Sequence, residues 1–404
     1  MKKITSFILC AAMAALVFTT VSCDPKETAK NYVLTVVSVL PGDLTVADIQ
    51  EISAEAVKDA EVSTFVPVVS GSDYSFTAEL PQGNYSVTVS GKTTDGKKSV
   101  VGTAEVALYE DQTLEINLES FATSPLIFKT IYPTTGKQFY IVGCDSYVEI
   151  VNNSDEVQYL DQIILVAVGG GQTQPNAWQA NGFENLYGGG DQGPVIAFPG
   201  NGTDYPLQPG KSVVVANNPK NHPAEMGEGY ENCADLSKAD WDIYLAHRSN
   251  DVDYEGIPNM EVVYQGPYGT MNAWGPFLGK GAFAIIKLPG GMTPAEYAAR
   301  DDSYMTTPGT KSTARYMVFP SDYVLDAVDV WDVAGETHYP TFLATDDAQG
   351  VLGVESYSGK CVRRKVVKIE NGRCYYKDTN NSSKDFLTDQ PLTPGVDPTA
   401  VDAD

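Results

Sequence analysis

The strongest constraint on the fold is a series of short segments in which apolar and polar residues alternate. Within residues 85–89 (Tyr-Ser-Val-Thr-Val) every second side chain is apolar, and residues 114–118 repeat the pattern. A period of two places the apolar side chains on one face of a β-strand, so we expect one face of each strand to be buried. Strands bounded by turn residues are predicted at residues 32–40, 62–69, 74–80, 85–90, 100–108 and 114–118.

One segment of this region, residues 48–60, fits two structures. Its apolar residues have helical spacing from Ile49 through Ile52 to Ala56, and strand spacing from Ile52 through Ala54 to Ala56. The pattern leaves both structures open.

The first 22 residues have the three parts of a secretory signal. Lys2 and Lys3 precede an apolar stretch at residues 7–18, and a small, polar run leads to Cys23. The apolar stretch is shorter than the roughly 20 residues that a transmembrane helix needs. A lone Cys that opens a polar, Pro-containing segment resembles bacterial lipoprotein signals, which implies acylation of Cys23. An ordinary cleaved signal is the alternative.

The five residues from Cys23 to Glu27 (Cys-Asp-Pro-Lys-Glu) resemble the acidic export signals of Bacteroidetes lipoproteins. This resemblance implies a chain anchored to the outer membrane through its N-terminal lipid and facing the cell exterior.

Acidic residues outnumber basic ones, 52 to 27, for a formal net charge of −25. A surface this acidic repels nucleic acid and anionic lipid, so no nucleic-acid partner is expected. It could attract cations or cationic ligands. A solvated acidic surface with no specific partner is the alternative.

The segment 76–89, FTAELPQGNYSVTV, resembles the Leu-Pro-x-Gly-x-Tyr hairpin of prealbumin-like sandwiches, including carboxypeptidase-regulatory-like domains. In those families the module is a spacer or stability domain. The resemblance therefore implies a spacer sandwich in the first part of the chain.

A second domain is indicated by residues 147–160, YVEIVNNSDEVQYL, which read as a strand, a polar turn and a second strand that runs on through Leu165. In residues 205–216, Pro209-Gly210 predicts a tight turn before a buried strand. Together these segments resemble the lamin-tail domain, an immunoglobulin-like sandwich. Similar closing elements are Arg363-Arg364, residues 378–386 and residues 391–395.

Asn371-Gly372 is the strongest hairpin signal in the chain. A two-residue turn there places Cys374 opposite Ile369 and leaves Cys361 about 8 residues, roughly 26 Å, away along the neighbouring strand. We therefore expect Cys361 and Cys374 not to pair. No Cys/His cluster has the spacing of a zinc site.

The sequence contains no recognised catalytic motif, and the chain is expected not to be an enzyme. Its three histidines, His222, His247 and His338, lie in unrelated segments. A hydrolase that assembles scattered residues in space is an open alternative. Two glycine runs, 169–171 and 188–190, do not open a helix with a Lys-Ser/Thr pair, so they predict loops, either bordering a ligand site or without function.

Two acidic clusters, residues 251–255 and 326–332, space carboxylates two or three residues apart, which could suit calcium. Neither matches the EF-hand pattern, and alternating acids along a strand usually form a wet face. No metal and no cofactor are therefore assigned.

Aromatic side chains among Gly and Pro mark two loops, 178–187 and 264–277, as the predicted ligand-binding surface. Such rings could stack on sugars, porphyrins or peptide side chains. Alternatively they plug the ends of a sandwich. The candidate residues are Trp178, Tyr187, Tyr264, Tyr268, Trp274 and Phe277.

The predicted fold is therefore mainly β: an immunoglobulin- or prealbumin-like sandwich followed by a larger lamin-tail-like sandwich with long loop insertions. Taken whole, the chain resembles a family of Bacteroidetes surface lipoproteins whose members accompany TonB-dependent outer-membrane receptors. This implies capture of a small ligand, glycan or peptide for uptake, and a structural or adhesive surface protein is the alternative. The expected divisions are a signal at 1–22, a tether at 23–30, a spacer sandwich at 31–120, a lamin-tail-like domain at 121–396 and a disordered acidic tail at 397–404.

Overall fold

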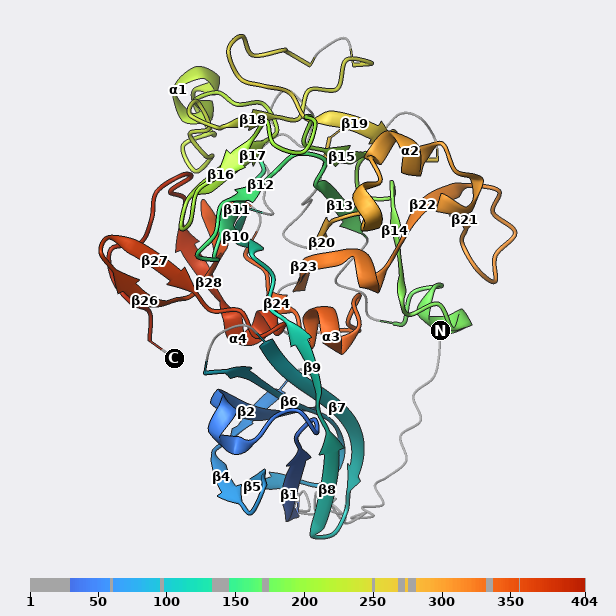
Figure 1. The fold of residues 1–404 in the computed structure, drawn as a ribbon, viewed down its shortest axis with the longest axis vertical. Coiled ribbons are helices and arrows are strands. Elements are labelled where there is room, and N and C mark those ends of the chain that lie inside the picture. The colour runs from blue at the N-terminus through green and yellow to red at the C-terminus, as the bar shows by residue number, and fades with distance from the viewer. Residues whose placement is uncertain are drawn as a thin grey trace, which may run out of the picture.

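The computed structural model arranges the chain as two β units stacked along its long axis (Figure 1). We call residues 30–122 the N-terminal sandwich and residues 126–403 the larger unit. Strands dominate both, so the predicted mainly-β fold class is confirmed. Within the described ranges, no helix has the length and apolar character to cross a membrane. The structure describes residues 30–58, 61–94, 98–132, 145–168, 174–248, 251–267, 273–274, 281–331, 337–355 and 357–403.

Two sheets, in which most strand pairs are antiparallel, form the N-terminal sandwich. The first, in spatial order, is β4 (Pro67–Ser70), β5 (Asp73–Pro81), β1 (Asn31–Val39) and β8 (Gln112–Asn117). The second is β3 (Glu61–Phe65), β2 (Ile49–Lys58), β6 (Gly83–Thr93), β7 (Lys98–Leu108) and β9 (Glu119–Ala122).

The core of the N-terminal sandwich lies between these two sheets. Val87 and Val89 of β6 are fully buried in one cluster with Val36 and Phe76 of the opposite sheet. The alternation in the sequence thus marks the residues that face this core.

Residues 48–60, for which helix and strand were both open, contain strand β2. Ala54 pairs with Val89 and Ala56 with Val87, and both alanines are fully buried. A helix here would leave one side of the β6 backbone without ladder partners, whereas the strand pairs it and adds apolar side chains to the core.

The single strand expected at residues 62–69 is in fact two strands that belong to different sheets. β3 ends at Phe65, β4 begins at Pro67, and Val66 between them is 77% exposed. Pro67 has no N–H to donate, so the chain leaves the second sheet there and continues as the edge strand of the first.

Two six-stranded sheets form most of the larger unit. One is β18 (Trp241–Asp242), β17 (Ser212–Ala216), β11 (Tyr147–Asn152), β10 (Leu126–Tyr132), β25 (Lys360–Arg364) and β28 (Phe386–Pro391). The other is β19 (Glu261–Tyr264), β15 (Val195–Ala197), β13 (Ile164–Val168), β20 (Gly281–Ile286), β23 (Val324–Trp331) and β24 (Val351–Leu352).

Smaller elements cover these sheets. The strands are β14 (Leu186–Gly189), β22 (Arg315–Pro320) and β21 (Tyr304–Thr306), the pair β12 (Gln158–Tyr159) and β16 (Pro206–Leu207), and the hairpin β26 (Val366–Glu370) and β27 (Arg373–Tyr376). The α-helices are α1 (His222–Met226), α2 (Pro294–Ala298), α3 (Ala344–Asp347) and α4 (Ser382–Asp385).

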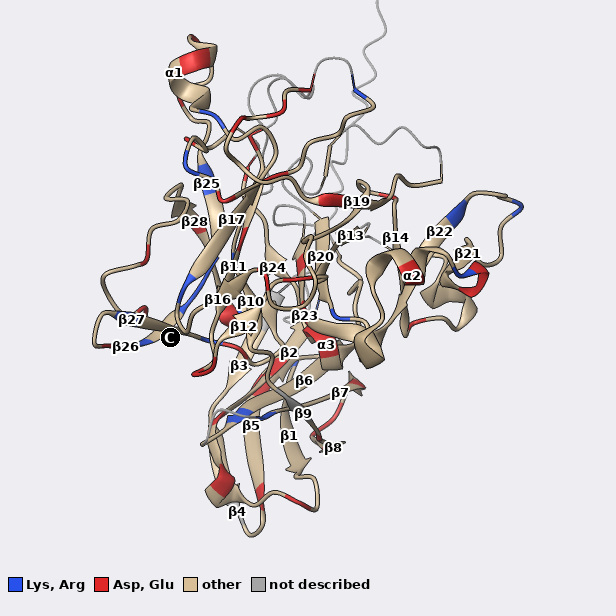
Figure 2. Cartoon of the chain, turned by 45° about the horizontal axis from the view of Figure 1, so that its top comes forward, with Lys and Arg blue, Asp and Glu red and all other residues tan. Residues whose placement is uncertain are grey.

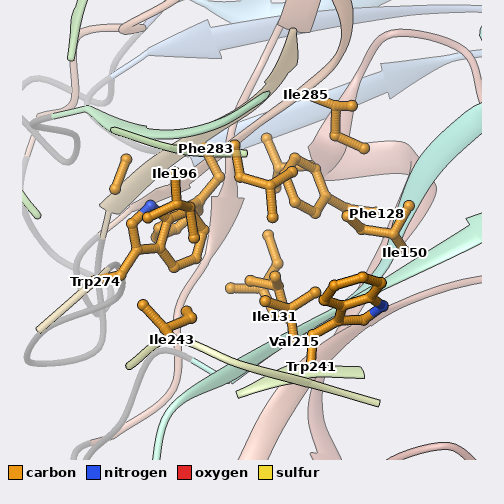
Figure 3. Close-up of a cluster of buried hydrophobic side chains, with 14 of the residues drawn as sticks. Phe128, Ile131, Ile150, Ile196, Val215, Trp241, Ile243, Trp274, Phe283 and Ile285 are labelled. Atoms are coloured by element: carbon orange, nitrogen blue, oxygen red, sulfur yellow. The ribbon is translucent and has the colours of Figure 1, made fainter. Parts of the chain in front are cut away.

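The main core of the larger unit fills the space between its two large sheets (Figure 3). Phe128 and Ile150 enter it from one sheet, and Phe283 and Ile285 from the other. A second cluster lies on the far face of the second sheet, beneath α2 and β22. Strands β13 and β20 are therefore buried on both faces, and their sequences are apolar throughout.

The second strand expected to run through Leu165 is interrupted at residues 160–163. β12 pairs with β16, and the chain then crosses to the other sheet as β13. Gln162 has a positive φ of 64° at the crossing. Burial would raise the pKa of Asp161, but N–H donors of a neighbouring loop, Asp204 at 2.7 Å among them, lower it below its ordinary value. This carboxylate holds the break in place.

Both predicted tight turns are confirmed. Gly210 has a φ of +72° before β17. Asn371 and Gly372 connect β26 to β27, and Ile369 pairs with Cys374 as expected.

The described cysteines agree with the prediction for this hairpin. Cys361 and Cys374 do not pair with each other, as expected, and both of them and Cys233 are buried and free. Cys144 lies outside the described residues.

The expectation of a disordered tail at residues 397–404 is wrong. Asp397 forms an ion pair with the fully buried Lys129 at 2.7 Å. The Asp402 carboxylate accepts hydrogen bonds from both terminal nitrogens of Arg363, each at 2.9 Å. Cations removed from water require anionic partners, and the tail supplies them.

Arg364 of β25 ties the two large sheets together. Its guanidinium binds both carboxylate oxygens of Asp326 on β23, at 2.8 and 2.9 Å, and lies 3.2 Å from Asp378. Its Nε donates to the Phe128 carbonyl, and its Cζ lies 4.6 Å from the centre of the Phe386 ring. The closing Arg, Asp and aromatic elements of the sequence thus meet here. The lamin-tail resemblance itself stays a prediction.

The two units are joined by specific polar contacts. Glu55 of β2 pairs with Lys384 of α4 at 2.5 Å and accepts from Ser383 at 3.2 Å. Ser99 of β7 donates to the Asp378 carbonyl at 3.3 Å. In Figure 1, α3 and α4 lie directly above the end of the N-terminal sandwich.

Candidate functional site

A hollow of about 440 Å³ lies where the N-terminal sandwich meets the larger unit; we call it the junction pocket. Its walls come from β9, the turn between β22 and β23, the first residues of β23, α3 and the segments before β14 and α4. It is therefore formed by both units together. Its polar lining residues are Glu119, Asn185, Ser321, Asp322, Thr345, Asp346 and Asn380.

Asp346 is the most deeply held carboxylate of the junction pocket. Its Oδ2 accepts from the hydroxyls of Tyr187 and Ser321. Burial raises the pKa of Asp346 above its ordinary value. The Tyr187 hydroxyl also accepts from the Leu343 N–H at 3.0 Å, so it joins β14 to the segment that leads into α3. Burial, and then the charge of Asp346, raise the pKa of Tyr187.

A second hollow of about 450 Å³ adjoins the first, and the two share Leu343. It is lined by Tyr339 and Phe342 on one side and by Gln179 and Glu184 on the other. The Phe342 ring packs edge-on against Tyr187, with 4.8 Å between ring centres. An apolar, aromatic hollow thus lies beside a polar, acidic one.

Two of the predicted aromatic residues, Trp178 and Tyr264, each pack against the glycine run at residues 188–190. A Cβ on Gly188 would lie 3.1 Å from the Trp178 ring, and one on Gly190 would lie 2.9 Å from the Tyr264 ring. These glycines therefore serve close ring-to-backbone packing, with Gly188 inside strand β14 rather than in a loop.

Two other predicted residues are not exposed loop side chains. Trp274 is 1% exposed in the main core, where it packs 5.7 Å from Phe283, and its main chain is held by the Asn217 amide (Figure 3). Tyr187 is 2% exposed, and its hydroxyl sits behind the pocket wall. Large rings remove much apolar area from water, which favours the plugging role over stacking on a ligand.

Tyr268, Phe277 and Cys23 lie outside the described residues. Tyr264 is half-buried against Tyr304, at 5.1 Å between ring centres, and its hydroxyl donates to the Arg315 carbonyl. The described lining of the two hollows does not include Tyr264.

The three histidines have different surroundings. His222 is fully buried, with Nε2 2.9 Å from the Asn218 carbonyl, and burial lowers its pKa to about 4. His338 stacks on Trp331, and His247 is exposed. The described lining of the two hollows includes none of the three.

In the acidic cluster at residues 326–332, Asp326 and Asp329 have protein partners, and Asp332 lies outside the described residues. Asp326 binds Arg364, and Asp329 accepts the Thr341 N–H at 2.7 Å. In the described ranges, no three His, Cys, Asp or Glu side chains are arranged to hold a metal ion. Acidic positions are instead spread over both units (Figure 2).

Sequence reasoning missed the residues that line the hollows. Asp346, Ser321 and Tyr339 belong to no motif: Asp346 and Ser321 meet in the junction pocket, and Tyr339 lines the adjoining hollow. A usable signal was the run from Tyr339 to Asp347 (Tyr-Pro-Thr-Phe-Leu-Ala-Thr-Asp-Asp), where aromatic, Pro and acidic residues crowd together.

Comparison with known proteins places part of the chain beside a family of proteins of unknown function, DUF4876. The family's sequence model matches residues 208–393, slightly less than half of the chain. A crystal structure of a DUF4876 family protein from Bacteroides thetaiotaomicron is similar over 92% of this chain and 99% of that chain, with a TM-score of 0.58 and 24% identity. The likeness supports the overall fold.

A structure of a candidate cell adhesion protein from Parabacteroides distasonis aligns over 78% of this chain and 89% of that chain. Its TM-score is 0.18 and its identity 10%, too low to inform the fold or the function. No curated protein matches this sequence.

Proposed function

We propose that this chain is a non-enzymatic binding lipoprotein, anchored through Cys23 to the outer face of the outer membrane, and that the junction pocket holds its ligand. The junction pocket carries this proposal, because a polar hollow beside an aromatic one is the usual composition of a small-ligand site. The direction of the chain supports it: β1 begins at the end of the N-terminal sandwich that points away from the larger unit (Figure 1).

The lining chemistry narrows the ligand class. Glu119, Asp322 and Asp346 offer carboxylates, Asn185 and Asn380 offer amides, and the described lining holds no Lys or Arg. Such groups accept from hydroxyl or ammonium groups and repel anions. The adjoining aromatic wall favours a ligand with an apolar face. We therefore propose a neutral or amine-bearing sugar as the ligand.

Titration calorimetry with the purified full chain tests this assignment. Neutral oligosaccharides and amino sugars should bind, and uronic acids of the same size should not. Tyr339→Ala removes a 39% exposed ring and should weaken binding at least about tenfold. Tyr159→Ala, which removes a similarly exposed ring on β12, is the matched control. Equal binding by both variants would exclude the adjoining aromatic hollow from the ligand site, and failure of every sugar would reject the ligand class.

We further propose that the protein serves a TonB-dependent outer-membrane receptor. The family resemblance of the sequence and the net charge of −25, which would keep the protein off anionic lipid, support this placement. Cross-linking in intact cells should capture such a receptor with the native chain. Cys23→Ala should release the chain from the membrane and abolish capture. If Cys23→Ala stayed membrane-bound, the anchor assignment would be wrong.

A further inference from the structure

Two buried oxygen atoms without hydrogen-bond donors belong to neighbouring residues at the edge of the first large sheet. Asp242 ends β18 and forms an isolated parallel bridge with Asn259. The backbone N–H of Asp242 donates to the Pro258 carbonyl at 2.9 Å, and the backbone N–H of Met260 donates to the backbone carbonyl of Asp242 at 2.8 Å. Side chains paired in this way point to the same side of the backbone. Asp242 Oδ2 and Asn259 Oδ1 are both buried and have no partner in the described part of the chain.

A further carboxylate lies next to this pair. Asn259 donates its amide to Asp253 Oδ1 at 3.1 Å, so the Asn259 side chain lies between Asp253 and the strand that carries Asp242. The Asp251 carboxylate is already used, because it accepts the N–H groups of Leu245 at 2.8 Å and Val252 at 3.0 Å. Asp251 therefore braces the loop, while Asp242 Oδ2 and Asn259 Oδ1 stay without a donor in the described ranges.

Arg248 and His247 act electrostatically on Asp251, whereas the groups that act on Asp242 include no cation in the described ranges. Asp242 is 1% exposed, and a buried carboxylate oxygen with no donor is costly. Burial, and then the charges of Asp251 and Asp253, raise the pKa of Asp242 to about 7. Two neighbouring acceptor oxygens can be stabilised either by a proton shared between them or by a bound cation.

We propose that Asp242, Asn259 and Asp253 form a Ca²⁺ site, with water completing the coordination shell. Carboxylate and amide oxygens are the ligands that Ca²⁺ prefers, and an irregular loop suits its flexible geometry better than the strict octahedron of Mg²⁺. Two carboxylates give a weak site, with a dissociation constant on the order of 10⁻⁴ to 10⁻³ M. Such affinity suits the calcium concentrations outside a cell. The bound ion would hold the loop 251–260 against β18.

Thermal unfolding of the purified full chain tests the site at pH 7.5 in EDTA, in 10 mM MgCl₂ and in 10 mM CaCl₂. Calcium should raise the Tm of the natural chain by about 2–4 °C, and magnesium should have little effect. Asp242→Asn keeps the shape and removes the charge, so it should abolish the calcium shift. Asp389→Asn, an exposed substitution on β28 at the opposite edge of the same sheet, should preserve it.

Two further measurements keep the test decisive if Asp242→Asn folds poorly. Asp253→Asn, on the exposed side of the site, should at least halve the calcium shift. Tb³⁺ should bind in place of Ca²⁺ and luminesce when the neighbouring Trp241 is excited, and added Ca²⁺ should quench that signal. A natural chain whose Tm ignores calcium, or equal shifts in all variants, would overturn the site in favour of a protonated Asp242.

Discussion

The N-terminal sandwich and the larger unit are both β-structures, yet they are stabilised differently. In the N-terminal sandwich the core is apolar and Glu55 is the only buried charged residue in the described ranges, facing the other unit. The larger unit buries a whole set of charges. They are Lys129, Asp145, Glu149, Asp161, Asp242, Asp326, Asp329, Asp347, Arg364, Asp378 and Asp385.

The difference follows from the amount of irregular backbone that each unit must bury. Strands satisfy their own N–H groups, but long connections do not, and a buried carboxylate can accept what the ladder leaves free. Asp347 shows this: its oxygens accept the N–H groups of Ser382 and Asp329, each at 2.8 Å. In the larger unit, buried aspartates therefore accept backbone N–H groups of the kind that strand pairing satisfies in the N-terminal sandwich.

Removing a buried cation should break this comparison most strongly. Arg364→Met leaves Asp326 and Asp378 buried without their cation, so the free energy of unfolding should fall by about 3–5 kcal/mol in urea titration. The control lies in the N-terminal sandwich. Lys98→Met breaks a pair with Asp43 whose side chains are 43% and 54% exposed, and should cost far less than Arg364→Met because solvent screens the pair. Equal costs would mean that the two units are stabilised alike.

Acid should weaken the larger unit through His222, whereas the N-terminal sandwich contains no histidine. Burial lowers the folded pKa of His222 to about 4, below the ordinary value of 6.5. The unfolded chain therefore binds the proton first, and stability is lost as pH falls from about 6.5 to 4, by on the order of 2–3 kcal/mol. His222→Gln, which can still donate to the Asn218 carbonyl, should flatten this part of the profile. An unchanged slope would exclude His222 as its source.

The smallest expected effect concerns ring packing on glycine. Gly188→Ala places a Cβ 3.1 Å from the half-buried Trp178 ring, which must move a few tenths of an ångström, at about 1 kcal/mol. Tryptophan fluorescence should shift toward that of an exposed ring. Gly42→Ala in the N-terminal sandwich meets nothing within 4 Å and should stay within about 0.5 kcal/mol. A larger effect at Gly42 would contradict this account of the glycines.

The same contrast explains which parts of the fold and of the candidate site could be predicted from the sequence. Alternation and turn residues predict strands because they act over a few residues, and so Val87, Val89 and the Asn371-Gly372 turn were located correctly. The partners of a buried carboxylate lie far along the chain, as with Arg364 and Asp326, and no local pattern reveals them. The junction pocket has the same origin, since its lining spans β9 to Asn380. Of the aromatic candidates, Trp274 is the case in which loop composition misled, because a Gly/Pro-rich segment can still bury its rings.

The parallel pairing of β1 with β8 has a mechanical consequence. The chain enters the N-terminal sandwich at Asn31, and β8 leads through β9 to the larger unit. Leu34 through Val39 pair in register with Gln112 through Asn117, running in the same direction. A pull between a membrane tether and a captured partner would slide these two strands past each other, so their hydrogen bonds would be loaded together rather than one by one. The N-terminal sandwich would then act as a shear-resistant link.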